Sequence, residues 1–326
     1  MNYLSVCSGI EAATVAWHHM GWKPVGFSEI EKFPSQVLAH HYPQVTNFGD
    51  MTKYKEWKLD DSIGLLVGGT PCQSFSVAGL RKGLEDPRGN LALTYVGILD
   101  KFRPKWCIWE NVPGVLSSGG GRDFGAFLGA LAELGYGFAY RVLDAQNFGV
   151  AQRRRRVFVV GCLGNWESAA KVLFESESLS GNIATAKKYE KENTNSNGKS
   201  SNQWCFDKCP TITSSASGFS RPGNVATEPD TYIAVDTYNG TIQGDVAATM
   251  TADMAGPTHS GPKVMQNMAV RRLTPKECER LQGFPDGYTN IKENCPDGPR
   301  YKALGNSMAV PVMRWIGERI NQYERP

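Results

Sequence analysis

A cysteine within a turn of small residues is the first candidate for chemistry in this chain. Cys72 follows Gly69, Thr70 and Pro71 directly after an apolar run at residues 63–67, and the residues after it are polar. A cysteine acts as a nucleophile when it is exposed and a nearby positive charge favours the thiolate. Most free cysteines are small buried apolar residues, but the polar neighbours of Cys72 argue against that role. The pattern therefore predicts that Cys72 is a nucleophile.

A carboxyl group and a basic cluster adjoin two other strand-like runs. Glu110 ends the run at 106–109, and four arginines at 153–156 precede the run at 157–160. Apolar surroundings would raise the pKa of the Glu110 carboxyl and make it a proton donor. Alternation along a strand puts Arg154 and Arg156 on one side and the other two arginines on the opposite side. Alternatively, Glu110 is a solvated loop residue and the four arginines form a solvated basic edge of the sheet.

Strand ends nearer the N-terminus outline a binding site for a nucleoside. Gly9 lies in a tight turn after the run at 3–7, Glu29 ends a second strand, and Asp50 ends a third strand position. A glycine turn at a helix N-terminus lets a cofactor approach the backbone, and a carboxylate there can accept hydrogen bonds from ribose hydroxyls. Asp50 could accept one from an adenine amino group. Each residue alone is also compatible with an ordinary turn or surface, but together they favour a cofactor site.

These residues need a sheet that brings several strand ends to one edge. Residues 1–163 supply it, because strand-like runs at 3–7, 25–28, 63–67, 106–109 and 157–160 alternate with helical patterns at 11–20, 33–40, 90–101 and 124–134. Nearly continuous apolar strands separated by helices indicate parallel strands covered on both faces. The fold class predicted is therefore α/β with a doubly wound sheet.

The second half of the chain has a different character. Residues 176–202 are polar, as in a linker, and residues 203–268 are rich in Thr, Ser, Gly and Pro with short β-prone pieces. Thr274, Pro275 and Glu277 have the spacing of a capping box, in a helix that should end near Gln282-Gly283. A last amphipathic helix is expected at about 310–322.

Composition excludes several classes of protein. The chain has 326 residues, 41% of them hydrophobic, and 35 Lys+Arg against 32 Asp+Glu give a net charge of +3. No apolar run is long enough to span a membrane, and the N-terminus lacks the pattern of a signal peptide. The 8 scattered cysteines fit reduced thiols. We therefore expect a cytoplasmic protein. Cys205 and Cys209 lack a second ligand pair at suitable spacing, so no metal is expected.

Taken in order, the motifs resemble those of the DNA (cytosine-5) methyltransferase family in a bacterial or phage form. The matching stretches are Ser8-Gly9, Glu29, Gly49-Asp50, Gly69 to Ser76, Glu110-Asn111-Val112, Gln152 to Arg156, Arg271 to Pro275 with Leu281 to Pro285, and Gly305-Asn306-Ser307. The resemblance implies the class I S-adenosylmethionine-dependent methyltransferase fold, a doubly wound and mostly parallel sheet with a second, smaller, irregular β-containing domain. It implies a catalytic and cofactor-binding domain at 1–165 plus 303–326, and a target-recognition domain with its hinge at 166–302.

The resemblance also implies a mechanism. Cys72 would attack carbon 6 of a cytosine flipped out of double-stranded DNA, Glu110 would donate a proton to ring nitrogen 3, and Arg156 would hold oxygen 2. Arg154 would support the region of Cys72. Carbon 5 would then take a methyl group from S-adenosyl-L-methionine before Cys72 is expelled.

The binding residues that the resemblance implies fall into two sets. Those for S-adenosylmethionine are Cys7, Gly9, Ile10, Glu29, Ile30, Asp50, Met51, Pro71, Leu91, Asn306 and Ser307. Those for DNA are Gln73, Ser76, Arg81, Lys82 and Arg88, in a loop that closes on the duplex, and Arg271 and Arg272. Because the recognition segment is not basic, we expect phosphate contacts from that loop and from residues 271–302.

Three residues depart from the family pattern. The family usually has a glycine where this chain has Glu11, an aromatic residue at Cys7, and an acidic residue at Arg155. The first two departures concern the cofactor turn, and Arg155 either lacks a partner or faces solvent.

Other functions remain open from the sequence. One branch of the family methylates tRNA cytosine, although the long insert favours DNA because base readout on a duplex needs a second domain. A catalytically retired DNA-binding module and a nicotinamide or flavin enzyme of the same fold are further alternatives. The leading expectation is a monomeric DNA methyltransferase in a bacterial host cell, acting beside a restriction endonuclease or alone.

Overall fold

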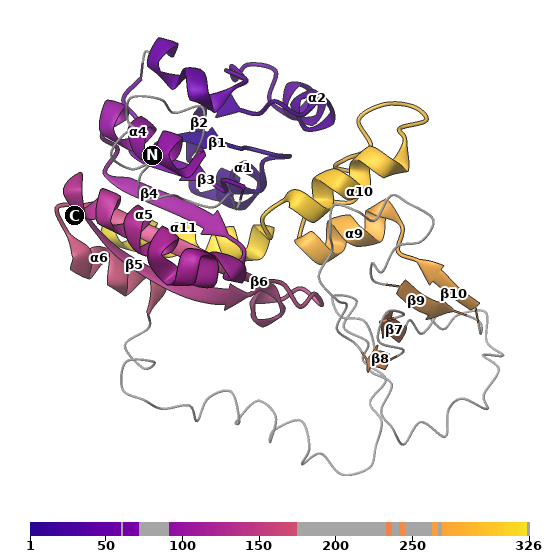
Figure 1. The fold of residues 1–326 in the computed structure, drawn as a ribbon. Helices are drawn as coiled ribbons and strands as arrows, with labels where there is room; N and C mark the ends of the chain where they lie inside the picture. Colours follow the sequence, from indigo (N-terminus) through magenta and orange to yellow (C-terminus); the bar gives the residue numbers. More distant parts are fainter. Residues whose placement is uncertain are drawn as a thin grey trace.

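The computed structural model describes residues 1–59, 61–71, 91–174 and 271–324, together with the backbone of short strands at 233–236, 241–244, 263–266 and 269–270. A six-stranded sheet with the order β2-β1-β3-β4-β6-β5 lies at its centre (Figure 1). Its strands are β1 (Asn2–Val6), β2 (Lys23–Ser28), β3 (Leu65–Gly68), β4 (Trp106–Asn111), β5 (Tyr136–Asp144) and β6 (Arg155–Leu163). The strands β2, β1, β3 and β4 are parallel, whereas β6 is antiparallel to both of its neighbours.

Helices cover both faces of this sheet, as the alternating pattern predicts. One apolar core joins α1 (Ala12–Trp17), α6 (Trp166–Leu173) and α11 (Val310–Glu324) to one face of the strands. A second core joins the 3-10 segment η2 (Met51–Glu56), α4 (Leu91–Phe102) and α5 (Arg122–Glu133) to the opposite face. Neighbouring residues of one strand enter different cores, so that Tyr3 belongs to the first and Leu4 to the second. This two-sided burial explains the nearly continuous apolar runs.

Three details of the predicted sheet are corrected. Residues 47–50 form only an isolated bridge between Phe27 and Asn47 and no third strand, because Asp50 caps η2 with its side chain. The strand at 155–163 is antiparallel, where the alternation of strands and helices had predicted parallel pairing. The strand β5 follows α5 after a short turn and pairs along its whole length with β6. This strand was not among the predicted ones, although its aromatic and β-branched residues are typical of a strand.

The C-terminal helices agree with the sequence. α9 (Pro275–Gln282) has the Thr274–Glu277 capping box and ends at Gly283 in a left-handed conformation. α11 packs against α1, and Arg319 donates hydrogen bonds to three carbonyls at the C-terminal end of α6. The remaining elements are α2 (Lys32–His41), η1 (His18–Met20), η4 (Pro113–Gly121), η5 (Ala145–Phe148) and α10 (Asp297–Asn306). None of the helices in the described ranges is long and apolar enough to cross a membrane.

A second, four-stranded antiparallel sheet has the order β10-β9-β7-β8 and lies beyond α9, away from the large sheet (Figure 1). Its strands are β7 (Ile233–Asp236), β8 (Thr241–Gly244), β9 (Lys263–Gln266) and β10 (Ala269–Arg272). This small sheet falls in the part of the chain where the sequence predicts an irregular β-containing domain. The chain boundaries of the two predicted domains stay a prediction.

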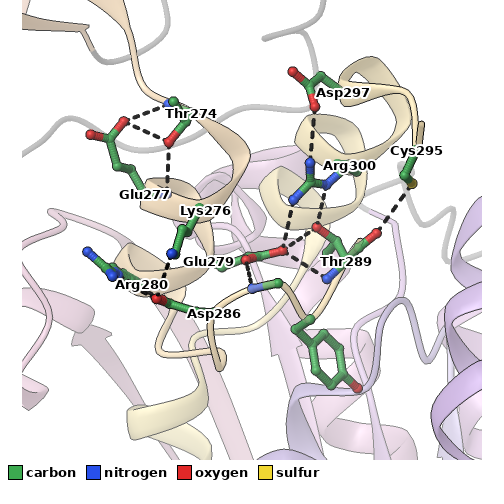
Figure 2. A network of polar contacts seen from close by, with 12 residues as sticks. Thr274, Lys276, Glu277, Glu279, Arg280, Asp286, Thr289, Cys295, Asp297 and Arg300 are labelled. Atoms are coloured by element: carbon green, nitrogen blue, oxygen red, sulfur yellow. Dashed lines mark hydrogen bonds and ion pairs between the residues drawn. The ribbon is translucent and has the colours of Figure 1, made fainter. Parts of the chain in front are cut away.

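A buried ionic network fixes the connection between α9 and α10 (Figure 2). Glu279 is fully buried and accepts hydrogen bonds from the backbone amides of Gly287, at 2.6 Å, and Thr289, at 2.8 Å. The Arg300 guanidinium supplies the opposite charge at 3.4 Å. A buried carboxylate needs such compensation, and these contacts tie the loop between α9 and α10 to both helices. That loop carries Tyr288, whose hydroxyl donates to the carbonyl of Ile10 at 2.9 Å.

Candidate active site

The antiparallel strand β6 brings the arginines to the carboxylate. The C-terminal ends of β1, β3 and β4 lie at one edge of the sheet, and β6 begins at that same edge because it runs in the opposite direction. Glu110 of β4 pairs in register with Phe158, so Arg156 lies close to its side chain. The Arg156 Nε is 3.1 Å from the Glu110 Oε1, with both side chains less than one fifth exposed, at 16% and 12%.

The alternation predicted for the arginine run is confirmed. Arg154 and Arg156 are buried or half-buried, whereas Arg153 and Arg155 are exposed. Arg155 is exposed, in agreement with the alternative that it faces solvent. Arg154 is 3% exposed, and its Nη2 donates to the carbonyls of Gly305, at 3.1 Å, and Ser307, at 2.7 Å. Its contacts to this C-terminal segment were not foreseen from the sequence.

Burial and nearby cations act in opposite directions on the pKa of the Glu110 carboxyl. Burial raises the pKa of the Glu110 carboxyl, and the nearby cations Arg154 and Arg156 offset part of that rise. Burial also lowers the pKa of Arg154 to about 9, which leaves it a cation at neutral pH. Burial thus favours the protonated form of this carboxyl, whereas the ion pair with Arg156 favours the ionised form.

The segment leading to Cys72 is anchored beside Glu110. The indole of Trp109 donates to the Thr70 hydroxyl at 2.9 Å, and the Asn111 amide donates to the Thr70 carbonyl at 3.0 Å. A Cβ atom at Gly69 would lie 2.8 Å from the Glu110 Oε2, so a larger residue there would displace the Glu110 carboxyl. Pro71 is exposed and is the last described residue before Cys72. The sequence-predicted residues Cys72, Gln73, Ser76, Arg81, Lys82 and Arg88 lie outside the described residues.

The turn after β1 has an unusual backbone. Cys7, Gly9 and Glu11 all have left-handed conformations, with φ values of 48°, 56° and 65°. No atom lies within 4 Å of a Cβ built at Gly9, and the Gly9 amide donates to the Glu29 Oε2 at 2.8 Å. The turn therefore leaves room for a ligand against its backbone. The hydrogen bond from Gly9 to Glu29 ties the turn to the end of β2.

This turn lines a pocket together with residues from the other end of the chain. The pocket lining includes Cys7, Gly9, Glu11, Glu110, Asn306, Ser307 and Met308. Four of these, Cys7, Gly9, Asn306 and Ser307, are among the residues predicted to bind a cofactor. The pocket also reaches Glu110, so the predicted cofactor site and the predicted catalytic group adjoin.

The other predicted cofactor residues are not among those that line the pocket, and their environments vary. Ile10 is fully buried and Ile30 is 73% exposed. Asp50 uses its Oδ1 to cap η2 through Thr52, while the Cys7 thiol donates to the Met51 sulfur at 3.4 Å. Burial raises the pKa of the Cys7 thiol to about 12, so this cysteine is no nucleophile at neutral pH. Leu91 is half-buried at the start of α4.

Two residues predicted to meet DNA are described, and their environments differ. Arg271 forms a bidentate ion pair with Glu277, at 2.8 and 2.9 Å, so its guanidinium also stabilises the start of α9. Arg272 is exposed. Within the described ranges, no group of three His, Cys, Asp or Glu side chains could hold a metal ion.

Comparisons with known proteins identify the family to which the chain is similar. The model of the family described as C-5 cytosine-specific DNA methylase matches residues 1–322. A protein of Escherichia phage P1 named DNA N-6-adenine-methyltransferase is 37% identical over 98% of this chain, which spans 61% of that relative's length. The type II methyltransferase M.SsoII of Shigella sonnei is 30% identical, over 97% of this chain and 79% of its own.

A likeness to a solved structure concerns the fold alone. The crystal structure of the S. pombe Dnmt2 methyltransferase superposes with a TM-score of 0.66 at 17% identity, covering 100% of both chains. Together with the sheet order, this likeness establishes the class I S-adenosylmethionine-dependent methyltransferase fold.

Proposed function

Because the chain belongs to the C-5 cytosine-specific DNA methylase family, we propose that it transfers a methyl group from S-adenosyl-L-methionine to carbon 5 of cytosine in double-stranded DNA. The observation that carries this proposal is the position of Glu110, which lines the pocket together with the β1 turn and forms an ion pair with Arg156. Thr70, two residues before Cys72 in the sequence, accepts a hydrogen bond from Asn111, the neighbour of Glu110.

The pocket residues fit the methyl donor. Gly9 leaves open space against the turn, and Asn306 and Ser307 line the same pocket. Glu29 keeps acceptor capacity beyond the two amides it already binds. The chemistry that S-adenosylmethionine supplies when bound is an electrophilic methyl group on a sulfonium. Ile30, exposed beside Glu29, offers an apolar surface for the adenine ring.

In the proposed reaction, the chain's own residues activate the base. The Cys72 thiolate adds to carbon 6, which makes carbon 5 an electron-rich centre, while Glu110 gives its proton to ring nitrogen 3. Arg156 holds oxygen 2, and Arg154 keeps the pocket wall at Gly305–Ser307 in place. Carbon 5 bonds to the methyl group as the bond from the methyl to the sulfonium breaks, with its electron pair kept by sulfur. Carbon 5 then loses its proton to a base, ring nitrogen 3 returns its proton to Glu110, and the carbon–sulfur bond to Cys72 breaks. The target base has to leave the duplex for this geometry, since carbon 6 is stacked there.

The remaining parts of the proposal concern DNA. Residues 166–302 would recognise the target sequence, with Arg272 and the loop residues Gln73, Ser76, Arg81, Lys82 and Arg88 on the backbone. A restriction endonuclease as partner and a monomeric enzyme stay predictions.

The name of the phage P1 relative raises adenine N6 as a second acceptor. An exocyclic amine carries its own lone pair, so its methylation needs no thiol that adds to the ring and no acid at a ring nitrogen. The motif Thr70-Pro71-Cys72 and the Glu110–Arg156 pair have a purpose in cytosine chemistry and none in adenine chemistry. We therefore favour cytosine.

The test is nucleoside analysis after transfer of tritiated methyl groups from S-adenosylmethionine to duplex DNA or to tRNA. We expect label in 5-methyldeoxycytidine. Label in N6-methyldeoxyadenosine, or label on tRNA alone, would overturn the proposal.

Variants then separate catalysis from binding. Cys72→Ser should lose methylation and the covalent complex with 5-fluorocytosine DNA, whereas Cys295→Ser, a half-buried thiol in the α9–α10 loop, should keep both. Glu110→Gln should lower the rate about 100-fold or more while DNA binding is retained. A fully active Glu110→Gln enzyme would exclude proton donation by Glu110, and a wild-type protein without the covalent complex would favour a retired DNA-binding module.

A further inference from the structure

Glu11 occupies a backbone position that disfavours its side chain. It has φ 65° and ψ 61°, the left-handed conformation, at the N-cap of α1. The family that the chain resembles usually has glycine there. A residue other than glycine in this conformation costs about 1–2 kcal/mol. A side chain kept at such a cost inside a ligand pocket is a candidate for a functional role.

The Glu11 carboxyl is buried among neutral donors. It is 1% exposed, its Oε2 accepts from the Ser5 hydroxyl at 2.8 Å, and its Oε1 accepts from the amide and hydroxyl of Thr14 at 3.2 and 3.1 Å. Within the described residues, no lysine, arginine or histidine forms an ion pair with it. Burial raises the pKa of Glu11 to about 7, and these hydrogen bonds offset part of the rise.

The titratable groups around Glu11 add no positive charge. Tyr3 of β1, Tyr42 at the end of α2 and Tyr288 after α9 are phenols whose pKa is raised, chiefly by burial, so they are neutral near pH 7. Glu110 lines the same pocket from β4 and already pairs with Arg156, while Cys7 in the same turn is a protonated thiol. Glu11, a residue of the pocket lining, therefore has a buried carboxyl with no cation among its partners in the described part of the chain.

We propose that Glu11 is the counter-charge for the α-ammonium group of S-adenosylmethionine and that it releases its proton when the cofactor binds. The inference rests on the proposed function, which supplies a ligand with two positive groups. In the proposed reaction the sulfonium carries the methyl group and has to lie near the cytosine, beside Glu110. The other positive group, the ammonium, would then lie at the β1 turn, near Glu11. An ammonium group at close range favours the ionised carboxyl strongly in a buried site.

The consequence is a cofactor affinity that depends on pH. Below its pKa the free protein holds Glu11 protonated, so binding must expel the proton and the affinity falls. From a pKa near 7, we expect about a tenfold weaker affinity at pH 6 than at pH 8, and release of about half a proton per cofactor at pH 7. Titration calorimetry in two buffers of different ionisation enthalpy measures both quantities without any catalytic turnover.

Variants and a second ligand make the test specific. Glu11→Gln should bind with equal affinity at pH 6 and pH 8 and release no proton, and so should Glu11→Gly, which also relieves the left-handed backbone. Glu318→Gln, an exposed glutamate on α11, should keep the wild-type dependence. S-adenosylhomocysteine keeps the ammonium and lacks the sulfonium charge, so it should show the same coupling.

Each contrary outcome is decisive. Proton release that persists in both Glu11 variants would overturn the inference, as would coupling seen with S-adenosylmethionine but absent with S-adenosylhomocysteine. Tight binding of S-adenosylmethionine with a pH-independent affinity would overturn the inference and leave the proposed function standing. A wild-type protein that binds neither ligand would overturn both.

Discussion

Replacing Arg154 tests whether its hydrogen bonds hold the segment 305–307 against the start of β6, beside the candidate active site. Arg154→Met keeps the length and apolar stem of the side chain and removes the donors to the Gly305 and Ser307 carbonyls. A hydrogen bond from a charged donor contributes about 1.5–3 kcal/mol, and both acceptors lie on buried residues. Relief of the buried cation offsets part of this loss. We expect the free energy of unfolding to fall by about 3 kcal/mol.

The same change should weaken cofactor binding. Asn306 and Ser307 line the pocket, and without Arg154 their segment loses its link to the start of β6. We expect at least a tenfold loss of affinity for S-adenosylmethionine, about 1.4 kcal/mol. Arg154→Lys should recover part of both losses, because an ammonium group can reach one carbonyl and lacks the planar fork of arginine.

Urea unfolding and titration calorimetry measure these effects, with Arg155→Met as the matched control. Arg155 is the next residue along the strand and is exposed, so its replacement should change the stability by less than about 0.5 kcal/mol. If Arg154→Met is as stable as this control and binds the cofactor equally well, the two carbonyl contacts do not hold the pocket wall.

Two further predictions concern stability. Glu11 has a folded pKa of about 7 against an ordinary 4.5, so its contribution to stability is complete below pH 4.5 and is lost as the pH rises to 7, by about 3 kcal/mol in total. Urea unfolding of the cofactor-free protein should therefore weaken from pH 5 to pH 8, and Glu11→Gln should flatten that dependence; parallel curves would contradict the raised pKa. Gly137→Ala should cost about 1–3 kcal/mol, since its Cβ would lie 2.3 Å from the Trp166 backbone nitrogen. Gly129→Ala, exposed on α5 with open space around it, should gain about 0.5–1 kcal/mol; equal effects of the two alanines would refute the packing of α6 against β5.

The sequence determined the properties that depend on local order along the chain. Alternation along one strand was enough to separate Arg154 and Arg156 from Arg153 and Arg155, because side chains of a strand point alternately to its two sides. The helix at Pro275–Gln282 was readable from Thr274, Glu277 and Gly283, since capping is a contact within one turn. The doubly wound sheet was readable from apolar strands between helices.

Only the tertiary structure decided what depends on strand direction and on distant partners. The antiparallel course of β6 brings Arg156 to Glu110, and no periodicity within 155–163 states the direction of a strand. The contacts of Arg154 with Gly305 and Ser307 join residues about 150 positions apart. Glu11 is the sharpest case. The sequence marked it only as a departure from glycine, whereas burial without a counter-charge, the feature that gives it a raised pKa, arises from β1, α1 and the loop after α9 closing around it.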